Sequence, residues 1–195
     1  MRENRPEVED WKSLQEKADI FFSKFDGLVL ENDEGKKITF RVKNFLVSNN
    51  SPIWDVELEG YPGAGMTFLL DYKNKRLTIE NFVKFEHPDL KSKGVFSQIR
   101  RFVGKNFPEG LEYCINVWNE RTKKQLLEVR KKYKRKLLGL SLAQAHNQIL
   151  QNYWVQEEIA AGFNNIKVVY DSDSQVRILE SKVTLPGLQF TVDFN

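Results

Sequence analysis

The sequence has few of the features that mark specialised classes of protein. It contains one cysteine, Cys114, so no internal disulfide can form, and 11 glycines and 6 prolines are too few for a collagenous or low-complexity chain. No window approaches the roughly 18 uncharged apolar residues that a membrane helix needs. No apolar run follows the basic start Met1–Arg5, so we expect no signal peptide. The lone cysteine and the missing targeting segment predict a reducing, cytoplasmic setting.

What is present suits a globular protein whose charge is unevenly distributed. The 195 residues are 41% hydrophobic, which is ample for one buried core, and we expect a single domain over residues 1–195. The net charge of +3 is too small by itself to imply a nucleic-acid partner. From Lys123 to Lys136, however, eight basic residues face one acid, Glu128, so this segment carries +7 and the rest −4. An argument for an anionic partner depends on that segment.

Hydrophobic periodicity predicts a mixed α/β chain of the α+β kind. Apolar residues at three- and four-residue steps from Trp11 to Phe25 predict a helix, and Ile53 to Glu59 alternates with the period of a strand. We expect helices at 7–25, 95–107, 119–139 and 141–161, and strands at 28–31, 36–47, 53–59, 66–71, 76–85, 111–117, 166–170, 176–182 and 189–194. Ser141 and Gly162 are expected to cap the last helix. The order predicts one mostly antiparallel sheet flanked by helices.

A polar loop with a glycine separates the strand at 76–85 from the next helix. Such a loop leaves the first N–H groups of the helix unpaired, and these groups form a site for an anion. Gly94 supplies the turn, and the loop's cations and hydroxyls are Lys91, Ser92, Lys93 and Ser97. The GxxxxGK[ST] spacing of a nucleotide-binding P-loop is absent. The sequence therefore predicts a phosphate-binding turn of another kind.

The segment from His87 to Ser97 resembles the acyl-CoA pyrophosphate loop of the GNAT acyltransferase superfamily, written Q/R-x-x-G-x-G/A. Lys91 stands where Gln or Arg is usual, Gly94 matches the first glycine, and Phe96 departs from the second small residue. Residues 113–119 are similar to the family's fifth strand and its Asn, and residues 160–163 to its helix-Gly-Phe-strand ending. The resemblance covers about residues 36–170. A helix at 7–26 and a helical insertion at about 123–160 are additions to the family's pattern.

The resemblance implies an N-acyltransferase that transfers an acetyl or other acyl group from acyl-CoA to an unknown amine acceptor by direct attack. It implies that Phe85 and Glu86 pair with the pantetheine arm, that Asn119 lies near the thioester, and that backbone N–H groups cradle the pyrophosphate. The residues of that cradle are Lys91, Ser92, Lys93, Gly94, Val95, Phe96 and Ser97. No metal site is predicted.

Direct attack needs a general base and an acid for the leaving thiolate. Glu80 and Glu86 are the candidate bases, because residues six apart share one face of a regular strand. In the family a tyrosine on a later helix is commonly the acid, which points to Tyr153, with Tyr133 as the other choice. His87, before Pro88 at a strand end, is interpreted as structural, and Cys114 as a buried core residue.

Two other functions stay open. A degenerate GNAT fold that binds or interacts without turnover is favoured by Phe96 and by the helical insertion. A nucleic-acid-associated protein would use the basic helix 123–136, but Tyr133 is its only aromatic residue and base stacking is poorly supplied. The basic segment is interpreted as a solvated helix face, and nucleic acid as an unlikely partner.

Overall fold

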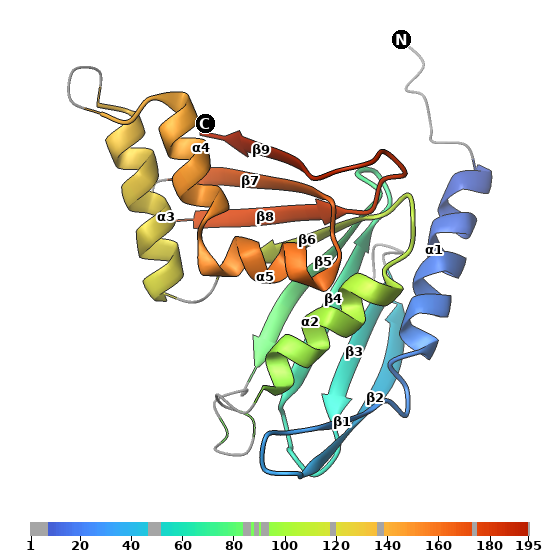
Figure 1. The fold of residues 1–195 in the computed structure, drawn as a ribbon. Coiled ribbons are helices and arrows are strands. Elements are labelled where there is room, and N and C mark those ends of the chain that lie inside the picture. Colours follow the sequence, from blue (N-terminus) through green and yellow to red (C-terminus); the bar gives the residue numbers. More distant parts are fainter. Residues whose placement is uncertain are drawn as a thin grey trace. The chain divides into compact units, whose positions relative to one another are not determined.

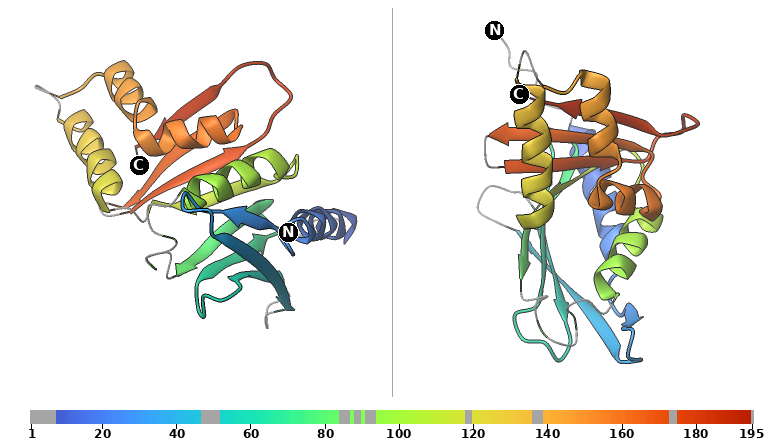
Figure 2. Two further views of the ribbon diagram at one scale, coloured as in Figure 1. Left: turned by 60° about the horizontal axis from the view of Figure 1, so that its bottom comes forward. Right: turned by 60° about the vertical axis from the view of Figure 1, so that its left-hand side comes forward.

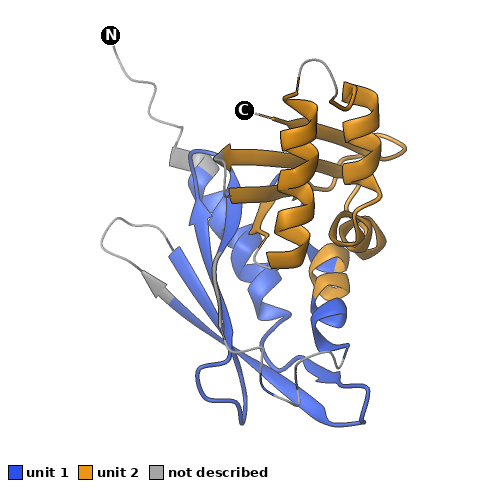
Figure 3. Cartoon of the chain, turned by 90° about the vertical axis from the view of Figure 1, so that its left-hand side faces the viewer, with its two compact units in different colours: residues 1–99, 106–112 blue, residues 100–105, 113–195 orange. Residues whose placement is uncertain are grey.

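The computed structural model describes residues 8–46, 52–83, 87, 90, 94–117, 120–135, 139–172 and 175–194. Within them the chain forms five helices and nine strands, the mixed α/β composition that the sequence predicts. The chain divides into two compact units (Figure 3), unit 1 with residues 1–99 and 106–112 and unit 2 with residues 100–105 and 113–195. The boundary passes through helix α2 (Val95–Asn106) and not through a linker, and a single domain over 1–195 stays a prediction.

Unit 1 contains an antiparallel meander (Figure 1). Its strands follow the chain in the order β1-β2-β3-β4-β5. They are β1 (Val29–Glu31), β2 (Lys37–Leu46), β3 (Pro52–Leu58), β4 (Gly65–Asp71) and β5 (Arg76–Val83). In β3, the buried Trp54, Val56 and Leu58 alternate with less buried residues. This confirms the period-2 pattern, in which one face of a strand enters the core.

Helix α1 (Val8–Ser23) packs on the unit 1 meander through aromatic side chains. Phe22 stacks on Trp54 with ring centroids 4.7 Å apart and lies edge-on to Phe68 at 5.0 Å. The indole Nε1 of Trp54 donates a hydrogen bond to Asp19 Oδ1 at 3.1 Å, so the buried ring keeps a polar partner. After the helix, Gly27 adopts a positive φ of 77°, a conformation that glycine commonly adopts where a helix ends.

Unit 2 contains a second set of paired strands, in the order β6-β8-β7-β9. They are β6 (Glu112–Asn116), β7 (Asn165–Ser172), β8 (Gln175–Ser181) and β9 (Gln189–Asp193). β8 is antiparallel to β6 and β7, whereas β9 runs parallel to β7. Helices α3 (Glu120–Tyr133), α4 (Leu142–Leu150) and α5 (Tyr153–Ala161) lie on one face of these strands (Figure 2). Cys114 is fully buried in β6, as predicted.

The helix expected at 141–161 is two helices, so this prediction is wrong. Ser141 caps α4 with a capping box to Gln144, and Gly162 ends α5 at φ 102°, which confirms both predicted caps. Between them Asn152 has extended backbone angles, φ −63° and ψ 133°, and its side chain accepts from the N–H of Trp154. An extended residue cannot continue a helix, and an Asn side chain that caps the next turn stabilises the break.

None of the helices in the described part of the chain is long and apolar enough to cross a membrane.

Candidate functional site

The predicted anion loop leads into α2, and the structure describes its helical end. Six of the predicted site residues lie outside the described residues: Phe85, Glu86, Lys91, Ser92, Lys93 and Asn119. Gly94, Val95, Phe96 and Ser97 are described, and they lie together at the start of α2 in unit 1. Val95 is fully buried and anchors the helix, while the other three are half-buried. The first turn of α2 contains no acidic residue, so its N–H groups meet no negative charge from that turn.

Gly94 adopts a positive φ of 73°, which L side chains rarely adopt. A Cβ at this position would also lie 2.5 Å from Asp33 Oδ1, so a larger residue would have to displace this carboxylate. Asp33 belongs to the turn between β1 and β2, and Gln98 of α2 donates a hydrogen bond to Glu31 O of the same region at 2.7 Å. The β1–β2 turn therefore holds the start of α2 and places an acid beside the expected anion site.

An aromatic and cationic cluster in unit 1 was missed by sequence reasoning. The exposed ring of His87 lies edge-on to Tyr61 with centroids 5.0 Å apart, and Lys36 Nζ lies 5.2 Å from the centre of the Tyr61 ring. His87 O also accepts a hydrogen bond from Leu90 N at 2.8 Å, which forms a turn before α2. The structural interpretation of His87 stays a prediction. The three residues come from distant segments, and no local pattern joins them.

The candidate base Glu80 lies at an irregularity in β5. Thr67 of β4 pairs with Asn81, but the next residue, Phe68, pairs with Ile79, so Glu80 is an extra residue without a partner position in the ladder. Such a β-bulge breaks the strict alternation of faces. The premise that Glu80 and Glu86 lie on a regular strand therefore does not hold, and their six-residue spacing no longer predicts a common face. Bulges are frequent beside active sites, where they redirect a side chain.

Tyr153, the candidate acid, belongs to unit 2. It is the first residue of α5, directly after the N-cap Asn152, and its side chain is 69% exposed. With residues of α3 and α4 it lines a groove of about 440 Å³, in which the other long polar side chains are Gln125, Glu128, Lys132, Gln148 and Gln151. A smaller pocket of about 200 Å³ lies where β6 ends, lined by Asn116, Val117, Glu120, Lys123, Gln175 and Val176.

Unit 2 also buries a cluster of ionisable side chains that the sequence analysis did not find. Arg100 and Glu158 form an ion pair with exposed fractions of 7% and 1%, and the guanidinium lies 4.6 Å from the centre of the Trp154 ring. Glu180 of β8 is fully buried opposite Tyr113 of β6. Among the described residues, neither carboxyl oxygen of Glu180 has a hydrogen-bond partner.

Burial shifts the pKa values of this cluster. Burial raises the pKa of the Glu180 carboxyl well above 4.5, an effect that the nearby Arg100 guanidinium opposes. Burial and the proximity of Glu180 also raise the pKa of Tyr113. Burial lowers the pKa of Arg100, although a guanidinium stays protonated in proteins. Glu180 is therefore neutral in the folded chain at a pH where an exposed glutamate is ionised.

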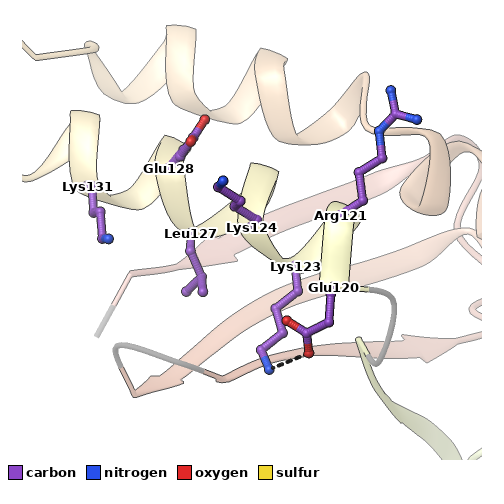
Figure 4. Close-up of a pocket in the computed structure, with 7 residues that line it drawn as sticks. All are labelled: Glu120, Arg121, Lys123, Lys124, Leu127, Glu128 and Lys131. Atoms are coloured by element: carbon purple, nitrogen blue, oxygen red, sulfur yellow. Dashed lines mark hydrogen bonds and ion pairs between the residues drawn. The ribbon is translucent and has the colours of Figure 1, made fainter.

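The outward side of α3 is strongly basic. We call this surface the basic face of α3. It consists of five cations of the helix, two cations that directly follow the helix, and one acid, Glu128. The cations are Arg121, Lys123, Lys124, Lys131, Lys132, Lys134 and Arg135. Its first part lines an open hollow of about 590 Å³ (Figure 4). No group of three or more His, Cys, Asp and Glu side chains that could hold a metal occurs among the residues that the structure describes.

No protein-family model matches the chain, and no curated protein matches it. Its fold is similar to that of a protein of unknown function from Aquifex aeolicus VF5, with a TM-score of 0.52 and 9% sequence identity. The match covers 85% of this chain and 80% of the other. At this identity the similarity concerns the fold alone, and it carries no residue role from one protein to the other.

Proposed function

We propose that the chain is an acyl-CoA-dependent N-acyltransferase of the GNAT type, which transfers an acetyl or other acyl group to an amine. The observation that carries the proposal is the start of α2, where Gly94 has a positive φ directly before a helix whose first turn has no acid. A helix start of this kind binds phosphate oxygens through its backbone N–H groups and its dipole. It follows a strand and a loop in the order that the resemblance implies.

The bulge at Glu80 supports a catalytic part for this strand. In the proposed reaction the amine nitrogen attacks the thioester carbonyl, a base takes the amine proton, and the C–S bond breaks as the thiolate receives a proton. The products are an amide and CoA. Glu80 of unit 1 is the proposed base. The resemblance points to Tyr153 of unit 2 for the acid, and that role stays a prediction. A reducing, cytoplasmic compartment suits this chemistry, since the one cysteine is a free thiol.

A CoA-binding or interaction module without turnover is the second candidate. The observation that favours it is the carboxylate of Asp33, which lies against Gly94 where a pyrophosphate would approach. The carboxylate of Asp33 and a bound pyrophosphate would repel each other at this helix start. This repulsion would weaken the binding of the cofactor by an active transferase. The two functions share the anion site and differ only in the chemistry that follows.

Asp33 also provides the test of the anion site. Asp33→Asn removes the charge and keeps the shape, so the dissociation constant of CoA in calorimetric titration should fall by about three- to tenfold, as expected for one nearby charge at the surface. Glu34→Gln is the matched control, because Glu34 lies in the same turn and is exposed. Saturating CoA should raise the melting temperature of the wild type by about 5–10 °C.

The melting temperature in the presence of CoA can also contradict the proposal. If CoA leaves the melting temperature of both the wild type and Asp33→Asn unchanged, the start of α2 is no pyrophosphate site and both candidate functions fail. If CoA binds, acyl transfer to a panel of amines separates them. Glu80→Gln should then lower turnover by about 10²-fold or more and remove the rising acid limb of the pH profile. Binding without transfer to any amine would support the module.

A further inference from the structure

We propose that the basic face of α3 binds double-helical nucleic acid through its phosphates, without regard to base sequence. The inference is independent of the proposed acyl transfer, because it concerns other residues. From the sequence alone, the basic segment 123–136 is interpreted as a solvated helix face. The structure adds where its cations lie, what holds the helix, and which acids are near.

The side of α3 opposite the basic face anchors the helix in unit 2. Thr122, Leu126 and Arg130 are its buried residues. Tyr170 of β7 donates a hydrogen bond to Leu126 O at 2.9 Å, and the Arg130 guanidinium lies 5.7 Å from the centre of the Tyr170 ring. One of the helix's cations is thus used in the interior. The remaining cations are presented outward on a firmly held helix.

In the described part of the chain, the cations of the basic face other than Lys123 form no ion pair. Lys123 pairs with Glu120 of the same helix at 3.3 Å. Some cations elsewhere in the chain do form ion pairs, such as Lys43 with Glu57 at 2.9 Å and Lys167 with Asp193 at 3.3 Å. Like charges three and four residues apart on a helix repel each other. Glu120 and Glu128 of the same helix offset only part of this repulsion, and a bound polyanion would relieve the rest.

The position of the cations along α3 gives a second indication. Arg121, Lys123 and Lys124 lie in the first two turns, where the helix dipole disfavours positive charge. The first turn also holds an acid, Glu120, and the last turn holds Arg130, Lys131 and Lys132. Cations over the whole length of the helix match a partner whose negative charge repeats along a line, as the phosphates of a nucleic acid do.

The surface has the dimensions of a duplex contact. In Figure 4, Lys123, Leu127 and Lys131 extend to one side of α3, and Arg121, Lys124 and Glu128 extend to the other, so each side of the helix presents cations. The 14 residues of α3 span about 21 Å. A helix with its side chains is about 10–12 Å wide, close to the width of the major groove of a DNA duplex, about 12 Å.

The chemistry of the face selects among anionic partners. Leu127 is the only apolar side chain that lines the hollow in the described residues, which offers little to an acidic protein segment that also needs apolar anchors. Tyr133 stacks on Phe194 with centroids 4.3 Å apart, so it is not available to stack on an unpaired base. Cations without stacking platforms are suited to phosphates on a duplex and not to single strands.

The experiment is a salt titration of binding with the full chain and a fluorescein-labelled duplex of 20 base pairs, followed by anisotropy. About four phosphate contacts predict a slope of log K against log[salt] near −3.6, and about a 100-fold loss of affinity between 50 and 200 mM salt. The double variant Lys124→Ala with Lys131→Ala should flatten this slope by about 1.8. The control, Lys43→Ala with Lys167→Ala, removes the same charge from paired lysines and should change neither slope nor affinity.

Three results would overturn the proposal. The first is that the wild type does not bind the duplex at 50 mM salt. The second is that the control variant loses as much affinity for the duplex as Lys124→Ala with Lys131→Ala does, because the effect would then depend on net charge alone. The third is competition by a single strand or by polyglutamate as strong as that by unlabelled duplex, which would make the face a site for any flexible polyanion. All four substituted lysines are at least partly exposed, so we expect each variant to fold. Circular dichroism of each variant checks that its helices are intact.

Discussion

The variant Glu180→Gln should be more stable than the wild type, by an amount that increases as the pH rises. The carboxyl is fully buried, and its pKa in the folded chain is well above the 4.5 of an exposed glutamate because burial disfavours the charged form. The folded state therefore holds a proton that the unfolded state releases. Its contribution to stability is complete below pH 4.5 and is lost progressively as the pH rises toward the folded pKa.

The size of the effect follows from proton linkage. Within that window the wild type loses about 1.4 kcal/mol of unfolding free energy for each pH unit through this group alone. Glu180→Gln is neutral at every pH and has nearly the same shape, so its stability equals that of the wild type near pH 4.5 and exceeds it increasingly above. The melting temperature of the variant should rise relative to the wild type by about 2–6 °C per pH unit.

The assay is thermal and urea unfolding at pH 4.5 to 8, with the difference between variant and wild type as the readout, because other titrating groups cancel in that difference. Glu109→Gln, an exposed glutamate of unit 1, is the control and should show a flat difference. The reasoning is refuted if Glu180→Gln becomes less stable than the wild type as the pH rises. That result would mean that Glu180 is ionised and paired with Arg100, which the structure pairs with Glu158.

Two further substitutions test other parts of unit 2. Arg100→Met leaves Glu158 buried without its cation and should cost about 3–5 kcal/mol in urea unfolding near neutral pH; a loss below 1 kcal/mol would show that the pair adds little. Ser141→Ala removes the capping box of α4 and should cost about 1 kcal/mol in the same assay, whereas Ser141→Asp should largely restore the stability.

Local patterns in the sequence predict most of the elements. The alternation in β3, the N-cap Ser141 and the C-cap Gly162 depend on neighbouring residues, and all three are as expected. The break at Asn152 was missed because apolar periodicity continues through it, although an Asn before Tyr153 is itself an N-cap signal. The burial of Glu180 was also missed, although its period-2 spacing to the buried Val176 and Ile178 is a signal for an inward-facing position.

Contacts between distant segments were beyond prediction. Nothing near Gly94 indicates that Asp33 faces it, since the two are 61 positions apart and meet only through tertiary folding. The same holds for Arg100 and Glu158, which each look like an ordinary charged residue on an amphipathic helix. The bulge at Glu80 depends on the pairing of β5 with β4, where one strand has a residue more than its partner. The geometry of the candidate site is therefore tertiary information.

The path of the chain through α2 has a consequence for how this protein can be divided. Unit 1 needs residues 106–112 in addition to 1–99, and unit 2 needs residues 100–105 in addition to 113–195. A cut anywhere between residues 99 and 113 leaves at least one fragment without a piece of its own interior, such as Phe107 of unit 1 or Arg100 of unit 2. We therefore expect that neither half folds as a self-sufficient module after simple truncation. A recombination event that joins one unit to another protein would have to transfer the whole of α2. It would also have to replace the part of α2 that the other unit loses.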